Sequence, residues 1–494
     1  MICVSIARTR QRMMVAEHQA IAERGCELVE WRVDYLQRHS DVLKLLPSRP
    51  TPVIFTVRRP PDGGRWSGTE EERQVLLRSA IVAGVDYIDL EDDIAAKIPR
   101  YGKTKRIISH HNFTETPGEL EGIHARMTKL NPDIIKLVTM ANSPSDCARM
   151  LKVVETAQVP TIGFCMGEFG MFSRILCGKY GAPFTYASIS REREVAPGQL
   201  TFDELKKLYR FDQITAQTPV YAVLGDPIGH SLSPLLHNRE LAKQKLPGVY
   251  VPIRLPADQM ESSLKALQSL QIQGFSVTIP HKEAIAAKFP AGEELVKKLG
   301  AANTLYLSDG GWKTANTDYH AAMDSLQEIL KPDEAIAGKR CLVLGAGGAA
   351  RAIAFGLVQA GGAVVIAGRT QARAKVLSEE LGCRFVSWEN RGAEYADILV
   401  NCTPQGMSPN FDETPYEEHW LRDEMIVFET IYNPEQTLLL KMARQRGCRT
   451  VSGVEMFVRQ AAGQFQFFTG KPASLESLRE TLRRSISAAK YDDE

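Results

Sequence analysis

The chain has 494 residues, which is too long for a single hydrophobic core, so two or three domains are expected. Its formal net charge is +1, which gives no electrostatic case for nucleic acid or an anionic membrane as a partner. The nine scattered cysteines form no CxxC pair, which favours reduced thiols in the cytoplasm, with a plastid as the alternative if a transit peptide has been removed. The longest uncharged stretch, residues 352–368, contains four glycines and is too short to span a membrane.

Residues 1–212 contain eight short runs of apolar or β-branched residues, and segments that can form helices separate most of them. The runs are residues 2–7, 27–34, 52–58, 87–91, 106–111, 133–138, 160–166 and 184–189. Thr69 with Glu72, and Thr201 with Glu204, fit capping boxes before helical patterns. Strands that alternate with helices in this number and over this length predict a compact (β/α)8 barrel.

Polar residues gather at the carboxyl ends of these runs, where a barrel assembles its active site. They are Glu30, Arg32, Asp34, Arg58, Asp89, Glu91, His110, His111, Lys136 and Met166, with Arg174 in the loop that follows the seventh run. Any one of them could be a satisfied polar group in the core. Several strands that each deliver an ionisable group to the same rim are harder to explain without a function. The sequence therefore predicts a catalytic site at this end of the barrel.

Lys136 lies within an apolar strand, between Ile135 and Leu137. Burial favours the uncharged amine, which can form an imine with a ketone. The imine acidifies the neighbouring C–H bond, and a histidine within reach can take that proton and then protonate a leaving hydroxyl. Arg32, Arg58 and Arg174 could hold a substrate carboxylate. The residues thus predict metal-free dehydration of a hydroxylated keto acid, with an aldolase that uses the same imine as the alternative.

The motifs EWRVD, FTVR followed by GG, SHHNF, DIIK and MGEFGMFSR followed by APGQ resemble type I 3-dehydroquinate dehydratases, over nearly all of residues 1–200. The resemblance implies that Lys136 forms the imine, that His111 is the acid–base residue and that Asp89 helps to orient it. It places in the substrate pocket Glu30, Arg32, Arg58, Met166, Arg174, Tyr186 and Gln199. Asp62, also assigned to this pocket, stands where many members have Glu, and Val195 occupies the place of a substrate-binding Ser. His110 should face the other side of its strand and be structural.

A polar linker that ends in proline is expected near residues 212–219, and two lobes follow it. The first, residues 219–330, contains strand-like runs at YAVLGD, YVPIRL and GFSVTIP. The second, residues 331–494, begins with the strand, glycine turn and helix of KRCLVLGAGGAARA. This context predicts a Rossmann lobe, in which the turn approaches a pyrophosphate. The residues assigned to that turn are Gly345, Gly347, Gly348 and Ala349.

The end of the next strand, AVVIAGRT, decides between the two nicotinamide cofactors. An NAD site places Asp or Glu there to bond the ribose hydroxyls. This chain has Arg369, Thr370 and then Arg373 instead, and cations suit a 2′-phosphate. The sequence therefore predicts NADP.

Reduction of a ketone also needs a proton donor beside the carbonyl, and Lys282 and Asp318 are candidates at the ends of strand-like segments. Ser231, Ser233, Thr278 and Asn303 could bind substrate hydroxyls or a carboxylate. The motifs GDPIGHSLSP, SVTIPHKE, GAANTL, ANTD, GAGGAARA, GRT, YNP and VEMFVRQAAGQF resemble shikimate dehydrogenases over residues 219–485.

This second resemblance implies that Lys282 and Asp318 are the catalytic pair. It adds Tyr432 and Gln460 to the substrate contacts and Gly453 to the cofactor contacts. Ser276 stands where many members have Asn, and Tyr319 stands where Gly is common. These two changes leave the choice between quinate and shikimate open. Glu429 stands where Asp is common.

Together the halves resemble the bifunctional dehydroquinate dehydratase–shikimate dehydrogenase family. The resemblance implies 3-dehydroquinate, 3-dehydroshikimate and shikimate as small-molecule substrates, with no metal, nucleic acid or membrane as a partner. The expected architecture is α/β: a barrel over residues 1–212, a substrate lobe over 219–330, and a Rossmann lobe over 331–494 whose C-terminal helices return to the substrate lobe. Two alternatives stay open, a quinate dehydrogenase in the second half and a metabolite-sensing module without catalysis. The oligomeric state is not predicted.

Overall fold

The structure, a computed structural model, describes residues 1–39, 41–229 and 231–487. Contacts within the chain divide it into two compact units. The first comprises Met1–Ala222, Asp226–His230 and Pro247–Ile272, and the second comprises Val223–Gly225, Ser231–Leu246 and Gln273–Glu494. His230 of the GDPIGHSLSP motif lies outside the described residues.

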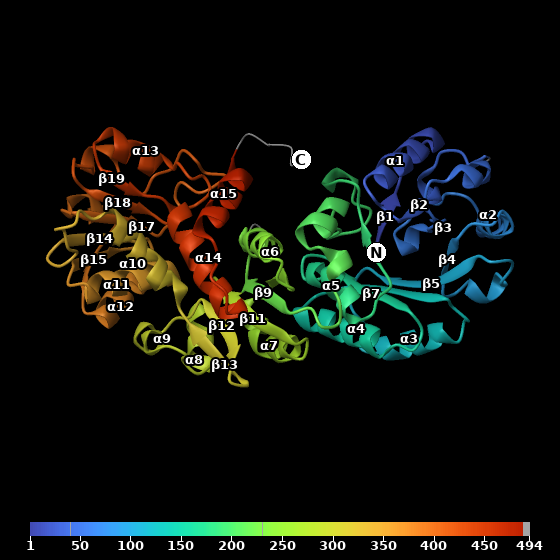
Figure 1. The fold of residues 1–494 in the computed structure, drawn as a ribbon, viewed down its shortest axis with the longest axis horizontal. Coiled ribbons are helices and arrows are strands. Elements are labelled where there is room, and N and C mark those ends of the chain that lie inside the picture. The colour runs from blue at the N-terminus through green and yellow to red at the C-terminus, as the bar shows by residue number, and fades with distance from the viewer. Residues whose placement is uncertain (40, 230, 488–494) are drawn as a thin grey trace. The chain divides into compact units, whose positions relative to one another are not determined.

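The first unit is built around an eight-stranded parallel sheet whose order, β7-β6-β5-β4-β3-β2-β1-β8, is that of a nearly closed barrel (Figure 1). Its strands are β1 (Ile2–Ile6), β2 (Leu28–Arg32), β3 (Val53–Thr56), β4 (Tyr87–Glu91), β5 (Lys105–Asn112), β6 (Ile134–Met140), β7 (Thr161–Met166) and β8 (Thr185–Ala187). The helices that alternate with them are α1 (Gln11–Glu23), α2 (Glu70–Val82), α3 (Leu120–Thr128), α4 (Pro144–Thr156) and α5 (Met171–Leu176). All eight predicted strands and the barrel are confirmed.

Helix α2 begins where the sequence predicts. Thr69 Oγ1 accepts a hydrogen bond from the backbone N–H of Glu72, and the Glu72 carboxylate accepts one from the N–H of Thr69. This capping box satisfies two of the N–H groups that a helix start leaves free. The box at Thr201 and Glu204 is also present, although a five-residue π-helical turn (Glu204–Leu208) follows it instead of an α-helix.

The barrel register explains why so many ionisable groups meet. Side chains alternate along a strand, so Asp89 and Glu91 on β4 point the same way, and so do Ser109 and His111 on β5. The register places Glu91 beside Ser109, and Ser109 beside Lys136. These side chains therefore share the inner face of the barrel. The intervening His110 pairs with Asp92 and is half-buried, as expected for a structural residue.

A five-stranded sheet follows in the order β10-β9-β11-β12-β13, and the pairings of β11 with β12 and of β12 with β13 are antiparallel. Its strands are β9 (Val220–Gly225), β10 (Val249–Arg254), β11 (Ile272–Val277), β12 (Thr304–Ser308) and β13 (Gly311–Ala315). The helices of this part are α6 (Ser233–Lys243), α7 (Met260–Gln268), α8 (Lys282–Lys288), α9 (Glu294–Leu299) and α10 (Thr317–Ile329).

The third sheet is parallel, and its order β16-β15-β14-β17-β18-β19 is that of a dinucleotide-binding fold. Its strands are β14 (Arg340–Leu344), β15 (Ala363–Ala367), β16 (Arg384–Val386), β17 (Ile398–Asn401), β18 (Ile426–Glu429) and β19 (Arg449–Val451). The helices are α11 (Gly348–Gln359), α12 (Gln371–Leu381), α13 (Leu438–Gln445), α14 (Gly453–Thr469) and α15 (Leu475–Ile486). The predicted Rossmann lobe is confirmed.

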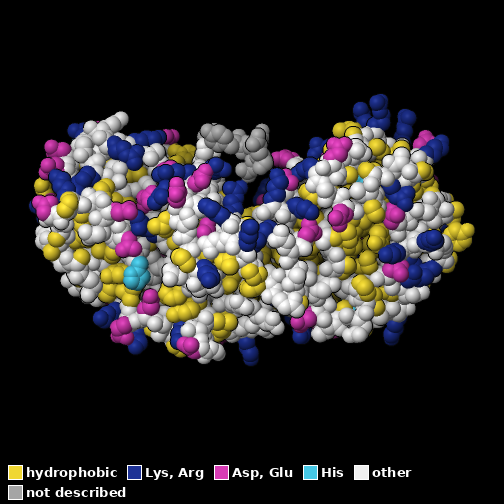
Figure 2. Space-filling model, in the orientation of Figure 1, with side chains coloured by type: hydrophobic (Ala, Val, Ile, Leu, Met, Phe, Trp, Pro, Cys, Tyr) yellow, Lys and Arg dark blue, Asp and Glu magenta, His cyan; other side chains and the backbone are white. Residues whose placement is uncertain are grey.

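Helices α14 and α15 pack back onto α6 through one apolar cluster that joins Leu236 to Val454, Val458, Leu478 and Leu482. Within the described residues, no helix combines the length and apolar character that crossing a membrane requires. Basic and acidic side chains are interspersed on the face of the molecule shown in Figure 2.

Candidate active sites

A pocket lies at the carboxyl ends of the barrel strands, and every residue that the resemblance assigns to it except Asp89 lines it. Those lining residues are Glu30, Arg32, Arg58, Asp62, His111, Lys136, Met166, Arg174, Tyr186 and Gln199. Asp89 lies directly behind them, in contact with Lys136 and Arg58. The fold therefore brings together residues that the sequence spreads over about 170 positions.

Lys136 lines this pocket and is 6% exposed. Its Nζ lies 3.2 Å from Asp89 Oδ2 and 3.4 Å from Glu30 Oε1. The same nitrogen lies 4.0 Å from the centre of the Tyr186 ring. The sequence predicts an apolar environment for Lys136, but the structure places two carboxylates beside its amine, and carboxylates suit an ammonium group. The amine must lose a proton before it can attack a ketone.

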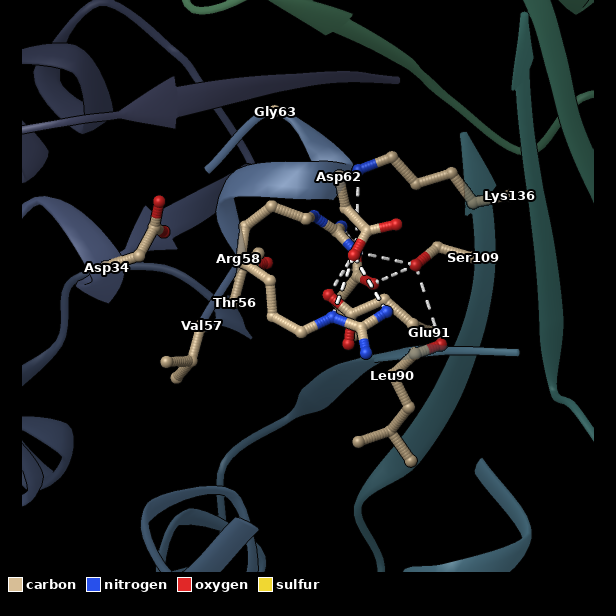
Figure 3. Close-up of polar contacts among 12 residues, drawn as sticks. Asp34, Thr56, Val57, Arg58, Asp62, Gly63, Leu90, Glu91, Ser109 and Lys136 are labelled. Atoms are coloured by element: carbon tan, nitrogen blue, oxygen red, sulfur yellow. Dashed lines mark hydrogen bonds and ion pairs between the residues drawn. The ribbon is translucent and has the colours of Figure 1, made fainter. Parts of the chain in front are cut away.

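Arg58 links Glu91 to Asp89, one of the two carboxylates beside Lys136 (Figure 3). Its Nη2 donates to Asp89 Oδ2 at 2.7 Å, and its Nη1 donates to Glu91 Oε1 at 2.9 Å and to Ser109 Oγ at 2.8 Å. Ser109 Oγ in turn donates to Asp89 Oδ1 at 2.6 Å. Burial acts to raise the pKa of Asp89, but Arg58 and Lys136 hold that pKa well below its usual value. Asp89 is therefore a permanent anion in this site.

The three arginines predicted to hold a carboxylate differ in what they already bind. Arg32 forms a two-bond ion pair with Asp34, and Arg58 is held by Asp89 and Glu91. Arg174, only 1% exposed, forms no ion pair with any described residue. Its Nη2 donates to the carbonyl oxygen of Pro197 at 3.1 Å, its Nε has no partner among the described atoms, and burial lowers its pKa to about 10. An unpaired buried guanidinium is the group of this pocket best suited to an incoming carboxylate.

His111 is neutral at physiological pH, because burial, with Arg58 and Lys136 nearby, holds its pKa well below the usual value. Its ring stacks on Phe113 with centroids 6.1 Å apart. Within the described part of the chain its buried Nδ1 has no hydrogen-bond partner. No hydrogen bond joins His111 to Asp89 among the described residues, and the Asp89 carboxylate is bound by Arg58, Ser109 and Lys136.

Asp62 lines the pocket, but it accepts a hydrogen bond from Arg59 Nε at 2.8 Å and makes none with His111. Three hydroxyl groups at the site were missed by the sequence analysis. Ser5 and Thr56 donate to Glu30 at 2.7 and 2.9 Å, and Ser109 donates to Asp89. Their position on inward-facing strand sites is the signal that could have found them.

The second site contains Lys282 at the start of α8 and Asp318 in the first turn of α10. Lys282 Nζ donates to Asp318 Oδ2 at 2.6 Å, so the predicted pair is in contact. The aliphatic part of Lys282 lies against the start of α11, where a Cβ on Gly348 would come within 2.8 Å of Lys282 Cδ. The glycine loop and the lysine therefore approach each other closely only because residue 348 has no side chain.

Asn303 is fixed by its neighbours. Its Oδ1 accepts from the N–H of Thr317 at 2.8 Å, and its Nδ2 donates to Thr317 Oγ1 at 2.8 Å. Gln464 of α14 donates to the Asn303 carbonyl oxygen at 2.9 Å and accepts from Ser276 Oγ at 2.6 Å. Ser276, which replaces a common Asn, thus supports the strand that carries Asn303. Gln464 is a further residue that the sequence analysis missed.

The other predicted substrate contacts are distributed around this site. Ser231 Oγ accepts from the N–H of Ser233 at 3.3 Å. Tyr432 stacks on Phe457 at 4.2 Å and packs against the apolar cluster of α6, the helix that begins at Ser233. Two side chains have no observed role beyond local structure: Gln460 Nε2 donates to the Phe457 carbonyl oxygen, and Thr278 is half-buried at the start of the turn before Lys282.

The glycine loop has the backbone that a pyrophosphate site needs. Gly345 has a φ of 118°, and a Cβ there would lie 2.9 Å from the carbonyl oxygen of Cys402. Gly347 is the N-cap of α11, so Gly348 and Ala349 start a helix whose first N–H groups are free for an anion. Gly453 is close-packed, because a Cβ there would lie 2.2 Å from the carbonyl oxygen of Ile431.

At the end of β15, Arg369, Thr370 and Arg373 are exposed, and neither arginine forms an ion pair with a described residue. No acidic side chain occupies the position where an NAD site requires one, since Gly368, Arg369 and Thr370 follow the strand directly. Two unpaired cations at this place fit a 2′-phosphate.

Comparison with known proteins assigns both halves. A family model described as Type I 3-dehydroquinase matches residues 2–216, and one described as Shikimate dehydrogenase substrate binding domain matches residues 223–305. Models described as Shikimate / quinate 5-dehydrogenase and as Shikimate 5'-dehydrogenase C-terminal domain match residues 326–410 and 453–483, respectively. The bifunctional 3-dehydroquinate dehydratase/shikimate dehydrogenase, chloroplastic, of Arabidopsis thaliana is 39% identical over 502 residues, which cover 96% of this chain and 83% of the relative. The chain belongs to this bifunctional family.

The bifunctional enzyme thus joins a lyase and an oxidoreductase of the shikimate pathway, which sets aside the non-catalytic sensing module. Its second half is 37% identical over 279 residues to the shikimate dehydrogenase (NADP(+)) of Caldanaerobacter subterraneus subsp. tengcongensis, which covers 55% of this chain and 99% of that relative. A crystal structure of shikimate dehydrogenase with NADP+ shares 32% sequence identity with a TM-score of 0.52, covering 55% of this chain and 97% of the other.

Proposed function

We propose that the barrel dehydrates 3-dehydroquinate through an imine on Lys136. Arg174 carries this proposal, because it is the buried cation of the pocket that has no acidic partner among the described residues. A substrate carboxylate bound there would place the ring over Lys136 and His111. The amine attacks the ketone and water leaves. Neutral His111 takes the proton from the adjacent carbon and returns a proton to the departing hydroxyl. Hydrolysis of the imine then releases 3-dehydroshikimate.

We propose further that the second half reduces the 3-dehydroshikimate ketone to shikimate. NADPH supplies the hydride when bound. Gly345, Gly347, Gly348 and Ala349 would hold its pyrophosphate, Arg369, Thr370 and Arg373 its 2′-phosphate, and Gly453 would border the same site. Lys282 donates a proton to the carbonyl oxygen, and Asp318, at 2.6 Å, holds the ammonium group in place. Ser231, Ser233, Thr278, Asn303, Tyr432 and Gln460 would contact the substrate.

Borohydride trapping tests the first reaction. Reduction of the enzyme in the presence of 3-dehydroquinate should add the mass of the reduced adduct to a single peptide, and tandem mass spectrometry should place it on Lys136. The Lys136→Ala chain is the matched control and should remain unmodified. Adduct formation on another lysine, or full dehydratase activity in the Lys136→Ala chain, would contradict the proposal.

Quinate oxidation is the alternative activity of the second half, and a family model that matches it names both substrates. We propose shikimate as the preferred substrate. Tyr319, one of the two departures from the common pattern, packs against Phe355 in an apolar cluster. Ser276 is engaged by Gln464. Turnover of shikimate with NADP+ should exceed that of quinate with NAD+, and the reverse order would favour quinate.

We propose small-molecule substrates as the only ligands of these sites. The formal net charge of +1 and the interspersed charges on the face shown in Figure 2 support this proposal. We keep the cytoplasm as the proposed location. The relative from Arabidopsis thaliana is described as chloroplastic, which keeps the plastid as the alternative. Microscopy of the native gene product with a C-terminal tag separates the two.

A further inference from the structure

Arg73 is a buried guanidinium group that lies outside the dehydratase pocket but is connected to it. It comes from helix α2, is 0% exposed, and does not line the pocket. Its Nη1 donates to Glu91 Oε2 at 2.7 Å and to the carbonyl oxygen of Val57 at 2.9 Å. Its Nε and Nη2 donate to the two oxygens of Glu70 at 2.8 and 3.0 Å. A buried charge of this kind is weak evidence for stability, so its place beside the active site points to another role.

Glu91 joins Arg73 to the active site. One Glu91 oxygen accepts from Arg73 and the other accepts from Arg58 at 2.9 Å. Arg58 also binds Asp89, which lies 3.2 Å from Lys136 Nζ. Positive and negative charges therefore alternate without a gap from Arg73 to Lys136. Each of these side chains, Arg73 included, is at most 6% exposed, so solvent screens their interactions poorly.

We propose that Arg73 is a positioning residue of the dehydratase reaction, acting through Glu91 to keep Arg58 on Asp89 and so to set the charge that faces Lys136. When Arg73 neutralises Glu91, Arg58 can give more of its charge to Asp89. Lys136 then competes less well for that carboxylate, which leaves its amine freer to reach the substrate ketone. The bond from Arg73 to the Val57 carbonyl oxygen also anchors the backbone next to Arg58. The inference rests on the proposed imine chemistry of Lys136.

The direction of the effect follows from the charges around Lys136. The titratable and charged side chains that face it are Cys3, Glu30, Arg58, Asp89, His111 and Tyr186. Removing the Arg73 charge leaves Glu91 paired with Arg58 but not with Arg73. Arg58 is then drawn away from Asp89, and the site becomes more negative. His111 then holds its proton to a higher pH. Removing the Glu91 charge has the opposite sign.

The test is the pH profile of kcat/KM for dehydration, measured on the full-length chain. Arg73→Gln should move the acid limb of the profile upward by about 0.5–1 pH unit, and Glu91→Gln should move it downward. The Arg73→Gln/Glu91→Gln double variant should return close to the wild-type profile, because its two lost charges cancel. Arg73→Lys keeps the charge and should keep the profile, although kcat falls as the bonds to Glu70 and Val57 are lost.

Arg106→Gln is the matched control, since this barrel arginine is also buried but donates to the Ala95 carbonyl oxygen instead of a carboxylate of the network. It should lower thermal stability without moving the profile. Circular dichroism and thermal unfolding of each variant report whether the barrel has folded. If Arg73→Gln does not fold, the downward shift of Glu91→Gln carries the test.

Unshifted profiles in folded Arg73→Gln and Glu91→Gln, or shifts of the same sign, would overturn the role of Arg73. That result differs from failure of the proposed function, which would appear as a wild-type chain that does not dehydrate 3-dehydroquinate or does not form an adduct on Lys136.

Discussion

Arg58 and Arg174 are both nearly inaccessible to solvent at the same end of the barrel, yet their surroundings differ. Burial alone would lower the pKa of each. For Arg58, Asp89 and Glu91 reverse this effect and raise the pKa above its usual value, whereas for Arg174 burial prevails. A guanidinium group already bound to two carboxylates gains little from a third. We therefore assign the substrate carboxylate to Arg174 and the fixing of Asp89 to Arg58.

Arg174→Gln should reduce kcat/KM for dehydration by about 10²–10³, because loss of one partner of a desolvated ion pair costs about 2–5 kcal/mol. Arg174→Lys keeps a charge but loses the planar fork and should recover only part of the activity. Steady-state kinetics on the two variants test the assignment. Wild-type kcat/KM in both variants would indicate that Arg32 or Arg58 binds the substrate carboxylate instead.

Glu429 makes stability depend on pH. The carboxylate accepts hydrogen bonds from Asn401 Nδ2 at 3.0 and 3.1 Å, from the N–H of Ile431 and from Thr437 Oγ1. Burial nevertheless raises its pKa from 4.5 to about 7. Because the folded pKa lies above the unfolded one, the stabilising contribution of protonated Glu429 is complete below pH 4.5 and is lost as pH rises through 7.

Relative to Glu429→Gln, the wild-type chain should therefore lose about 3 kcal/mol of unfolding free energy between pH 4.5 and pH 8. Denaturant unfolding of both chains across this range measures the difference. The structure predicts a difference that changes with pH in this direction. A constant offset between the two curves would show that the carboxylate keeps its ordinary titration.

At the scale of elements, the segment between β15 and α12 selects the cofactor. Arg369 and Arg373 are exposed there and have no acidic partner among the described residues. Charge-assisted hydrogen bonds to a phosphate contribute about 1.5–3 kcal/mol each. The Arg369→Ser/Arg373→Ser variant should therefore raise the KM for NADPH by roughly 10²–10⁴-fold and leave the KM for NADH almost unchanged.

Arg384→Ser is a suitable control for this experiment, because Arg384 is an exposed arginine at the amino end of β16 that pairs with Glu394. The carboxyl ends of the strands bind the dinucleotide, so this variant should keep both KM values. If the KM values for NADPH and NADH rose equally in the Arg369→Ser/Arg373→Ser chain, these arginines would contact a part of the dinucleotide that both cofactors contain, and not the 2′-phosphate.

The sequence predicted the strands better than it predicted the contacts between side chains. Continuous apolar runs located all eight barrel strands, because a parallel strand that is buried on both faces consists largely of apolar residues. Residues at the strand ends marked the site, because parallel strands bring their carboxyl ends to one rim. Contacts between side chains were less predictable. Ser5, Thr56 and Ser109 carry no catalytic signature in sequence, and only the register shows that their hydroxyls meet Glu30 and Asp89.

At the scale of the whole molecule, the two sites use different residues, and Lys136 and Lys282 have different acidic partners. Lys136→Ala should abolish dehydration and leave shikimate oxidation at the wild-type rate. Lys282→Ala should lower shikimate oxidation by about 10²–10⁴ and leave dehydration unchanged. Assays of both reactions on each folded variant test this independence. Loss of both activities from either single change would show that the sites depend on each other.

The sequence by itself determined the class of the fold, the presence of two reaction centres and the residue types available to each, because periodicity and ordered motifs are local properties of the chain. Tertiary structure decided which of those residues are already paired. Among the described residues, Arg174 has no ion-pair partner and Asp62 is paired with Arg59. Asp89 is surrounded by Arg58, Ser109 and Lys136. The physical reason is that a buried charge is governed by its nearest opposite charge. In this barrel that neighbour usually comes from another strand, many residues away in the chain.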